Sequence, residues 1–157
     1  MNIDQKNSFF KDRREGRIIA FQSVFSCGFN DTKIDDILKF DWMTESKNTV
    51  SIEYAKFLVA GTLKNLDEID EIIKSKLKNW DINRISSVDK AILRFSIFSL
   101  LYENDLDEKI VINEAIEIAK IFGNEDSYKF INGILDAVKG TKKEKKLWLH
   151  HGACYSC

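Results

Sequence analysis

The sequence contains no proline and only 7 glycines in 157 residues. Proline removes a backbone hydrogen-bond donor and interrupts helices, so a chain without it can form long, unbroken helices. Sandwiches and barrels, which connect many short strands, normally use more turn residues than this. The composition therefore argues against an all-β fold and favours a helical one.

Other classes of protein are excluded by what is missing. No apolar run reaches the roughly 18 residues that a membrane span needs, and residues 1–17 have no apolar signal core, so we expect neither a membrane protein nor a secreted one. The three cysteines, Cys27, Cys154 and Cys157, are an odd number with two crowded at the tail. They do not suggest a disulfide framework, and we expect a cytoplasmic location.

Sites for catalysis are also scarce. The sequence has no glycine-rich phosphate loop. Its only histidines are His150 and His151, so a Ser-His-Asp or Cys-His arrangement would have to recruit one from the tail. The carboxylates within 67–71 have the helical spacing of a solvated face. We therefore expect no enzyme, no catalytic residue and no cofactor.

The charge is nearly balanced in total but unevenly distributed. The chain has 24 Lys and Arg against 25 Asp and Glu, a net charge of −1. Residues 1–17 carry a net charge of +2 and residues 139–146 carry +4, which leaves −7 on residues 18–138. Basic ends of this kind can contact polyanions, although they can also be simply solvated termini.

Hydrophobic periodicity predicts an all-α fold of about seven helices without a convincing strand. Ser51 and Ser87 are expected to cap two of the helices, and Gly123 to take the left-handed position after another. The helix that begins at Ser87 is apolar nearly all round, so it should be buried among the others. The expected helices lie at about 11–26, 34–40, 51–63, 66–77, 87–104, 110–122 and 127–140.

Several residues are candidates for nucleic-acid binding. Arg13 and Arg17 are four apart and share one helix face. Lys129 and Phe130 lie in the first turn of their predicted helix, whose amides favour phosphate. Phe122 and Phe130 can stack on unpaired bases, and the alternative is that both belong to the core. Arg94 lies inside the helix that is expected to be buried, and this position favours pairing with a buried carboxylate over contact with a ligand.

The tail has a composition of its own. We expect a single domain over 1–140, followed by a tail over 141–157 that is basic and then rich in Cys and His. Cys154 and Cys157 have zinc-ligand spacing, and the two histidines could complete a set of four ligands. No second Cys or His cluster exists in the sequence, so we expect a flexible tail without a metal, with zinc binding as the alternative.

Three stretches resemble one known family. VINEAIEIAKIFGNEDSYKFINGILD at 111–136 resembles the C-terminal signature of the transcription antitermination factor NusB family. VDKAILR at 88–94 is similar to the central-helix motif of that family. RREGRIIAFQSVF at 13–25 is similar to its arginine-rich motif and first helix. The resemblance covers roughly residues 11–139, with the same order and spacing.

The resemblance implies a fold of two perpendicular helical bundles with seven helices in total. It also implies a function without catalysis. Members of the family bind the boxA element of nascent ribosomal leader RNA together with NusE, a small-subunit ribosomal protein. The pair joins other Nus factors on the RNA polymerase elongation complex and suppresses premature termination.

The resemblance also implies roles for individual residues. It implies that Asp89 faces NusE. The RNA-binding positions that it implies are Arg13, Arg14, Arg17, Asp126, Lys129 and Phe130, with Phe122 and Arg94 as weaker candidates.

The chain departs from the family pattern at two places. Glu15 stands where the motif usually has a basic residue, and at 105–107 Asp-Leu-Asp replaces Asp-x-Pro. An alternative function is a homo-oligomeric helical interaction protein, such as a homodimer, with a generic RNA-binding surface.

Overall fold

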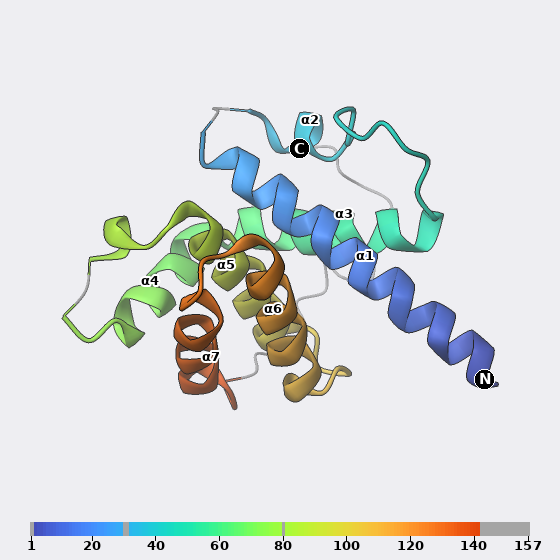
Figure 1. Ribbon diagram of the computed structural model, residues 1–157. Coiled ribbons are helices and arrows are strands. Elements are labelled where there is room, and N and C mark those ends of the chain that lie inside the picture. The colour runs from blue at the N-terminus through green and yellow to red at the C-terminus, as the bar shows by residue number, and fades with distance from the viewer. Residues whose placement is uncertain (1, 30–31, 80, 142–157) are drawn as a thin grey trace.

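The computed structural model describes residues 2–29, 32–79 and 81–141 and confirms the all-α prediction (Figure 1). Within these residues it contains seven α-helices, one short 3₁₀ turn and no strand. The elements are α1 (Ile3–Cys27), α2 (Ile34–Ile37), α3 (Thr49–Lys64), α4 (Leu66–Lys76), the turn η1 (Ile82–Arg84), α5 (Ser87–Tyr102), α6 (Glu108–Phe122) and α7 (Ser127–Val138).

The helices form two layers that meet at α5. α1 packs along α3, and α4, α6 and α7 pack around α5. In Figure 1, α3 runs across the page whereas α6 and α7 run up and down, so the two layers cross. Twelve of the 16 residues of α5 are buried, as its apolar composition predicted. The helix contacts α1, α3, α4, α6 and α7, which makes it the centre of the core.

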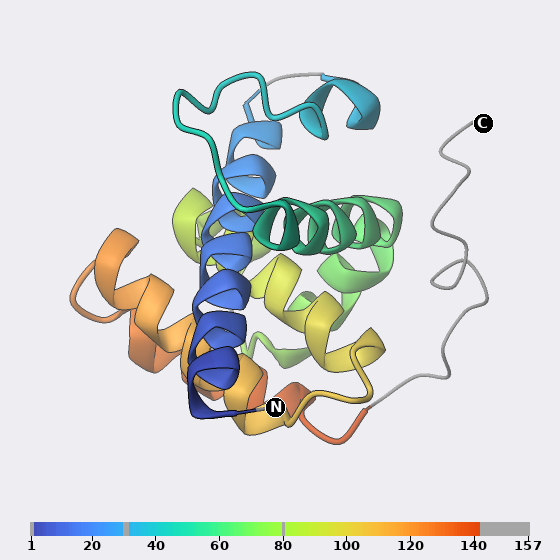
Figure 2. The same cartoon turned by 90° about the vertical axis from the view of Figure 1, so that its right-hand side faces the viewer.

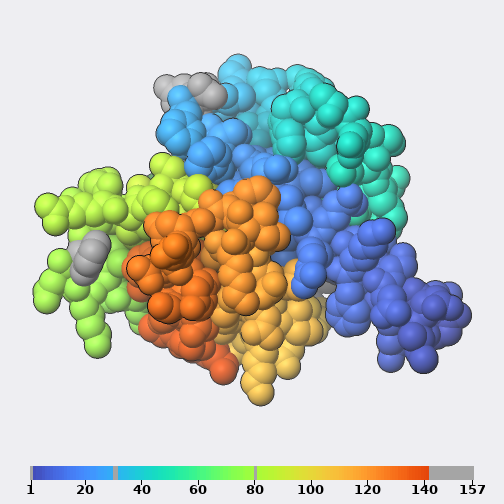
Figure 3. Space-filling view, viewed as in Figure 1, coloured from blue at the N-terminus to red at the C-terminus, as the bar shows by residue number. Residues whose placement is uncertain are grey.

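The first helix is longer than the sequence predicted. It begins at Ile3 rather than at Lys11, and its N-terminal turns extend beyond the body of the molecule (Figures 1 and 3). Asn2 and Gln5 form a capping box, in which each side chain accepts a hydrogen bond from the other residue's backbone N–H, at 2.9 and 3.0 Å. We predicted the start of this helix from the pattern of buried apolar residues. That pattern could not reveal residues 2–10, because they are all exposed. The spacing of Asn2 and Gln5 is the signal that marks the true start.

Two predicted N-caps are displaced along the chain. Asn48, not Ser51, caps α3, and its side chain accepts from the N–H of Val50 at 2.9 Å. Ser86, not Ser87, caps α5, and its hydroxyl accepts from the N–H of Asp89 at 3.0 Å. Several capping residue types lie close together at both starts, so composition alone did not select the right one. α2 is also shorter than predicted and ends at Ile37.

Gly123 does not take the left-handed conformation that we predicted. Its backbone is extended, with φ −90° and ψ −174°. A Cβ atom at this position would lie 2.6 Å from Oγ of Ser127 and 2.7 Å from the carbonyl oxygen of Ala119. The glycine is therefore needed because the start of α7 approaches the end of α6 closely.

The buried apolar side chains of the described residues form one cluster. None of the described helices combines the length and the apolar character that a membrane crossing needs. Seen from the side, the N-terminal end of α1 lies in front of α6 and beside the turn that leads into it (Figure 2). The tail with its candidate zinc ligands His150, His151, Cys154 and Cys157 lies outside the described residues.

Candidate nucleic-acid interface

The arginine-rich segment of α1 packs closely against α3. A Cβ atom at Gly16 would lie 2.8 Å from the carbonyl oxygen of Ser51 and 2.9 Å from Cδ1 of Tyr54, so glycine permits this approach. The approach brings the ring of Tyr54 next to two arginines. The guanidinium carbons of Arg13 and Arg17 lie 4.0 and 5.3 Å from the centre of that ring, within the range of cation–π attraction.

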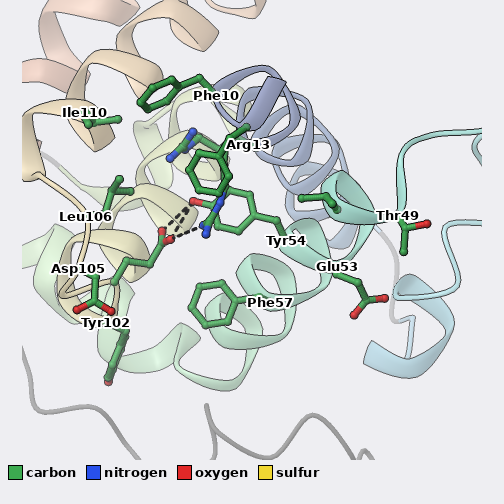
Figure 4. Close-up of a pocket in the computed structure, with 14 residues that line it drawn as sticks. Phe10, Arg13, Thr49, Glu53, Tyr54, Phe57, Tyr102, Asp105, Leu106 and Ile110 are labelled. Carbon is green, nitrogen blue, oxygen red and sulfur yellow. Dashed lines mark hydrogen bonds and ion pairs between the residues drawn. The ribbon is translucent and has the colours of Figure 1, made fainter. Parts of the chain in front are cut away.

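Glu103, just after α5, holds Arg13 and Tyr54 together. Figure 4 labels Arg13 and Tyr54 and marks these contacts with dashed lines. Its carboxylate accepts a hydrogen bond from Nη1 of Arg13 at 3.2 Å and one from the Tyr54 hydroxyl at 2.9 Å. It also accepts from the hydroxyl of Ser99. Burial, with the negative charge of Glu103, raises the pKa of Tyr54 well above its usual value, so Tyr54 stays a donor. Arg13 is thereby fixed in orientation while part of its side chain stays exposed.

Glu114 on α6 holds the other two arginines. Arg14 donates from Nη2 at 2.6 Å and from Nε at 3.0 Å, a two-point pair that raises the pKa of the Arg14 guanidinium. Nη1 of Arg17 lies 3.8 Å from the same carboxylate. The side chain of Arg14 is 56% exposed, whereas that of Arg17 is 5% exposed. Arg14 therefore presents its charge to solvent, and Arg17 joins α1 to α6.

The turn between α6 and α7 brings a second set of candidates to the same side of the molecule. The ring of Phe122 is partly exposed and lies 4.8 Å from the ring of Phe21 on α1. The exposed side chains of Asp126 and Lys129 form an ion pair at 3.3 Å. Phe130 is half-buried and packs against the core. Phe122 and Lys129 are therefore accessible, and Phe130 has a partly structural role.

The start of α7 is less open to phosphate than the sequence suggested. Oδ1 of Asn124 accepts hydrogen bonds from the backbone N–H groups of Asp126 and Ser127, both at 3.0 Å. The hydroxyl of Ser127 accepts in turn from the N–H of Asn124. These two amides at the helix start already have hydrogen-bond partners within the chain, so they are not free to bind a phosphate.

The accessible candidates lie over three neighbouring elements, which we call the α1–α6–α7 face and define by Arg14, Phe122, Asp126 and Lys129. The pair between Arg14 and Glu114 and the ring contact of Phe122 with α1 hold these elements side by side. Figure 3 shows α1 in blue directly beside α6 and α7 in orange and red. The structure thus places cations and an aromatic ring from distant parts of the sequence on one surface.

Two further candidates lie on other sides of α5. Arg94 donates from Nε and Nη2 to the carboxylate of Asp70 on α4, both at 2.8 Å, so the pairing that its own sequence position favoured is confirmed. Asp89 lies in the first turn of α5 and is 7% exposed. Among the described residues, Oδ1 of Asp89 is buried without a hydrogen-bond partner.

Glu15 is the position at which the chain departs from the arginine-rich motif. Its carboxylate pairs with Nζ of Lys47 at 3.3 Å.

The sequence did not identify Tyr54, Glu103 or Glu114. Glu103 and Glu114 are 90 and 100 positions from the arginines that they hold. No local spacing signals such a pair, and acidic residues are common on solvated helix faces. Their role became visible only in the folded chain.

A helical fold that gathers cationic and aromatic side chains on one face is typical of nucleic-acid-binding proteins. The NusB family model matches residues 14–139, which is most of the chain. The chain belongs to the NusB family.

The relatives agree in sequence and in fold. "Transcription antitermination protein NusB" of Treponema denticola is 47% identical over 129 residues, which are 81% of this chain and 95% of that protein. The protein of the same name from Leptospira biflexa is 42% identical over 125 residues, which cover 80% of this chain and 89% of the relative. These relatives are antitermination proteins, and the family is not a known enzyme family.

Solved structures extend the comparison. NusB of T. maritima superimposes with a TM-score of 0.75 at 38% identity, covering 80% of this chain and 89% of that one. A crystal structure of the antitermination factors NusB and NusE with double-stranded RNA has a TM-score of 0.70 at 25% identity. It covers 82% of this chain and 96% of that chain. The fold that the resemblance implied is therefore confirmed.

Proposed function

We propose that this chain is an RNA-binding adaptor in transcription antitermination. It binds the boxA element of a nascent ribosomal leader RNA together with NusE, and the complex joins RNA polymerase and other Nus factors in the cytoplasm. Membership of the NusB family supports this function, as does the similar fold of a NusB crystallised with NusE and RNA. The observation that carries the proposal is the cluster of three arginines that Glu103 and Glu114 hold at the edge of the α1–α6–α7 face.

The geometry divides the candidate residues by role. Arg14 and Lys129 are the most exposed cations among the candidate residues, so we assign phosphate binding to them and a partial share to Arg13. Phe122 offers a ring for stacking on a base, next to Phe130 and Asp126 at the start of α7. Arg17 supports this surface from within, because it is buried and lies close to Glu114 of α6. Arg94 does not belong to this surface, since it pairs with Asp70 on α4.

The ion pair of Arg14 with Glu114 is compatible with RNA binding. Exposed ion pairs contribute only about 0–1 kcal/mol, because water screens them and ordering two side chains costs entropy. A phosphate is a stronger partner for guanidinium, since it offers oxygens that match the planar fork of donors. Arg14 can therefore exchange Glu114 for RNA, and Glu114 holds it ready in the free protein.

NusE binding is assigned to the side of α5 that carries Asp89. The resemblance implies this position, and a buried carboxylate oxygen without a partner is consistent with a donor arriving from another chain. A homodimer remains the alternative use of these surfaces. Light scattering with and without RNA separates the two, because an adaptor binds RNA as a monomer and a dimer that hides the face must dissociate first.

The experiment that tests the function is fluorescence anisotropy with a labelled boxA RNA. The full chain is titrated with and without NusE, beside a scrambled RNA of equal length at the same salt concentration. We expect tighter binding to boxA and a further gain when NusE is present. Equal binding to both RNAs, unchanged by NusE, would reduce the surface to a general polyanion patch and overturn the proposal.

A further inference from the structure

A large pocket lies between the N-terminal half of α1, the start of α3 and the turn from α5 to α6. Its volume is about 750 Å³. Phe9, Phe10 and Val50 are exposed apolar side chains that line it, with Phe10 53% exposed. Figure 4 shows Leu106 and Ile110 on the same side of the pocket as Phe10, with Thr49 across from them. Exposed apolar surface gathered in this way marks a site that another segment covers.

The charges around the pocket favour a cationic occupant. Three carboxylates line it, those of Glu53, Glu103 and Asp105, against the two arginines Arg13 and Arg17. Arg13 pairs with Glu103, Arg17 lies close to Glu114, and Glu53 pairs with Lys56. The lining side chains keep a net charge of −1, so a segment with lysines next to apolar side chains matches the pocket better than a polyanion does.

The described part of the chain ends close to the rim of this pocket. Gly140, with φ +85°, turns the backbone after α7, and its N–H donates to Oε1 of Glu108 at 3.0 Å. Glu108 begins α6 and lies two residues from Leu106 and two from Ile110, both of which line the pocket. The chain that follows Thr141 therefore starts beside the opening.

The sequence after Thr141 has the chemistry that the pocket requires. Residues 142–146 are Lys-Lys-Glu-Lys-Lys, and residues 147–149 are Leu-Trp-Leu. Five residues can span up to about 17 Å, which is enough to carry segment 147–149 from Glu108 across the pocket rim. The NusB family model matches only as far as residue 139, so this segment is a feature of the chain beyond the family match.

We propose that segment 147–149 docks into this pocket of its own chain, with the lysines of 142–146 against Glu53 and Asp105. The apolar side chains of segment 147–149 would cover the apolar part of the lining, which includes Phe10, Val50 and Ile110. Docking there covers the pocket side of Arg13 and Arg17. The tail would thus bind, within the same chain, a surface next to the proposed RNA-binding face. This docking can be measured in the absence of RNA.

The test uses ¹⁹F NMR of the full chain labelled with fluorotryptophan. Trp148→Phe assigns its signal among the three tryptophans of the chain. We expect the Trp148 signal to differ from its position in the urea-unfolded chain and to be shielded from solvent. Phe10→Ala and Val50→Ser should each move it toward the unfolded position, because both side chains are removed from the proposed site.

Ile3→Ala is the matched control, since Ile3 is an exposed apolar residue of α1 that does not line the pocket. It should leave the Trp148 signal unchanged. Phe10, Val50 and Ile3 are all exposed, so these variants should keep the fold, which circular dichroism checks. A Trp148 signal at the unfolded position in the unsubstituted chain overturns the proposal. A signal that moves with dilution also overturns it, because the occupant would then come from a second copy.

Discussion

At the scale of single residues, acidic side chains control the arginine-rich segment. Glu103 and Glu114 sort the arginines into one that is buried and two that reach solvent. Carboxylates repel the phosphates of RNA, yet on the proposed RNA-binding face they order the cations before RNA arrives. A long, flexible arginine loses about 2 kcal/mol of rotamer freedom when it is fixed, and part of that loss has already occurred in the free protein.

The first prediction concerns the exposed cations. Arg14→Ala combined with Lys129→Ala should weaken binding of boxA RNA and flatten its dependence on salt. Each lost phosphate contact should lower the slope of log K against log salt by about 0.7 for single-stranded RNA. Fluorescence anisotropy at several salt concentrations measures both effects. The fold should survive, because the side chains of Arg14 and Lys129 are exposed and Glu114 keeps Arg17 nearby as a second cation.

Lys74→Ala is the matched control for this variant. Lys74 pairs with Glu71 three residues away on α4, as Lys129 pairs with Asp126 on α7, and both lysines are exposed. The control should leave the RNA affinity and the salt slope unchanged. If it reduced both as much as the double variant did, binding would not be localised to the α1–α6–α7 face.

The second prediction concerns Tyr54, whose hydroxyl donates to Glu103. Tyr54→Phe should cost about 2 kcal/mol of unfolding free energy near neutral pH, because a hydrogen bond to a charged group is lost. The pKa of Tyr54 is raised in the folded chain. Its contribution to the unfolding free energy is therefore complete below the ordinary tyrosine pKa of about 10, and it is lost as the pH rises beyond that value toward the pKa of the folded state.

The unfolding free energy of the unsubstituted chain should therefore fall more steeply above about pH 10 than that of Tyr54→Phe. Urea unfolding at a series of pH values measures this difference. Tyr128→Phe, at the half-buried Tyr128 on α7, serves as the control and should follow the unsubstituted chain. Parallel curves for Tyr54→Phe and the unsubstituted chain would show that Tyr54 does not carry the effect.

At the scale of elements, small residues set how closely helices approach. Gly16 brings α1 against α3 at the arginine cluster, and Gly61 on α3 faces the ring of Phe98 on α5. These contacts fix the distance between layers, and with it the position of Tyr54 under the arginines. Glycine weakens a helix interior by roughly 0.5–1 kcal/mol relative to alanine, so its presence at packed positions indicates a steric need.

The third prediction compares two glycines in helices. Gly61→Ala should lower the unfolding free energy by about 1–3 kcal/mol, because the new methyl group overlaps the buried ring of Phe98. Gly133→Ala on α7 should raise it by up to about 1 kcal/mol, because nothing lies within 4 Å of the added Cβ atom. Urea unfolding of both variants gives the comparison. Effects of the same sign would contradict the packing argument.

At the scale of the whole molecule, α5 links the two layers. It packs against α1 and α3 on one side and against α4, α6 and α7 on the other. Its largest buried side chains include Phe95, Phe98 and Tyr102. Neither layer can therefore keep its apolar surface covered without the other, which supports the prediction of a single domain over 1–140.

The fourth prediction follows from this shared core. Urea should unfold the chain in one cooperative transition, with the same midpoint for the helix signal at 222 nm and for the near-ultraviolet signal of the buried tyrosines. Tyr54 and Tyr102 report on α3 and α5, whereas the helix signal averages over all elements. Two separated midpoints would mean that the layers unfold independently and that the domain prediction is wrong.

The limits of sequence-based prediction differ between elements and site. Apolar periodicity located α5 and α6 well because their buried faces repeat at helical spacing. It failed at the start of α1, where exposed residues are held by a cap rather than by burial. Among site residues, the pairing of Arg94 with a carboxylate followed from its place in an apolar helix. The burial of Arg17 did not, since it depends on α3 and α6.

The helical class, the central position of α5 and, through three motifs, membership of the NusB family could all be predicted from the amino-acid sequence. These properties are encoded locally, in spacing along one helix or in a continuous stretch of residues. Which arginines reach solvent, which carboxylates orient them and where the pocket beside them opens became clear only in the folded chain. Those properties depend on contacts between residues about 100 positions apart, and such contacts exist only once packing has brought the helices together.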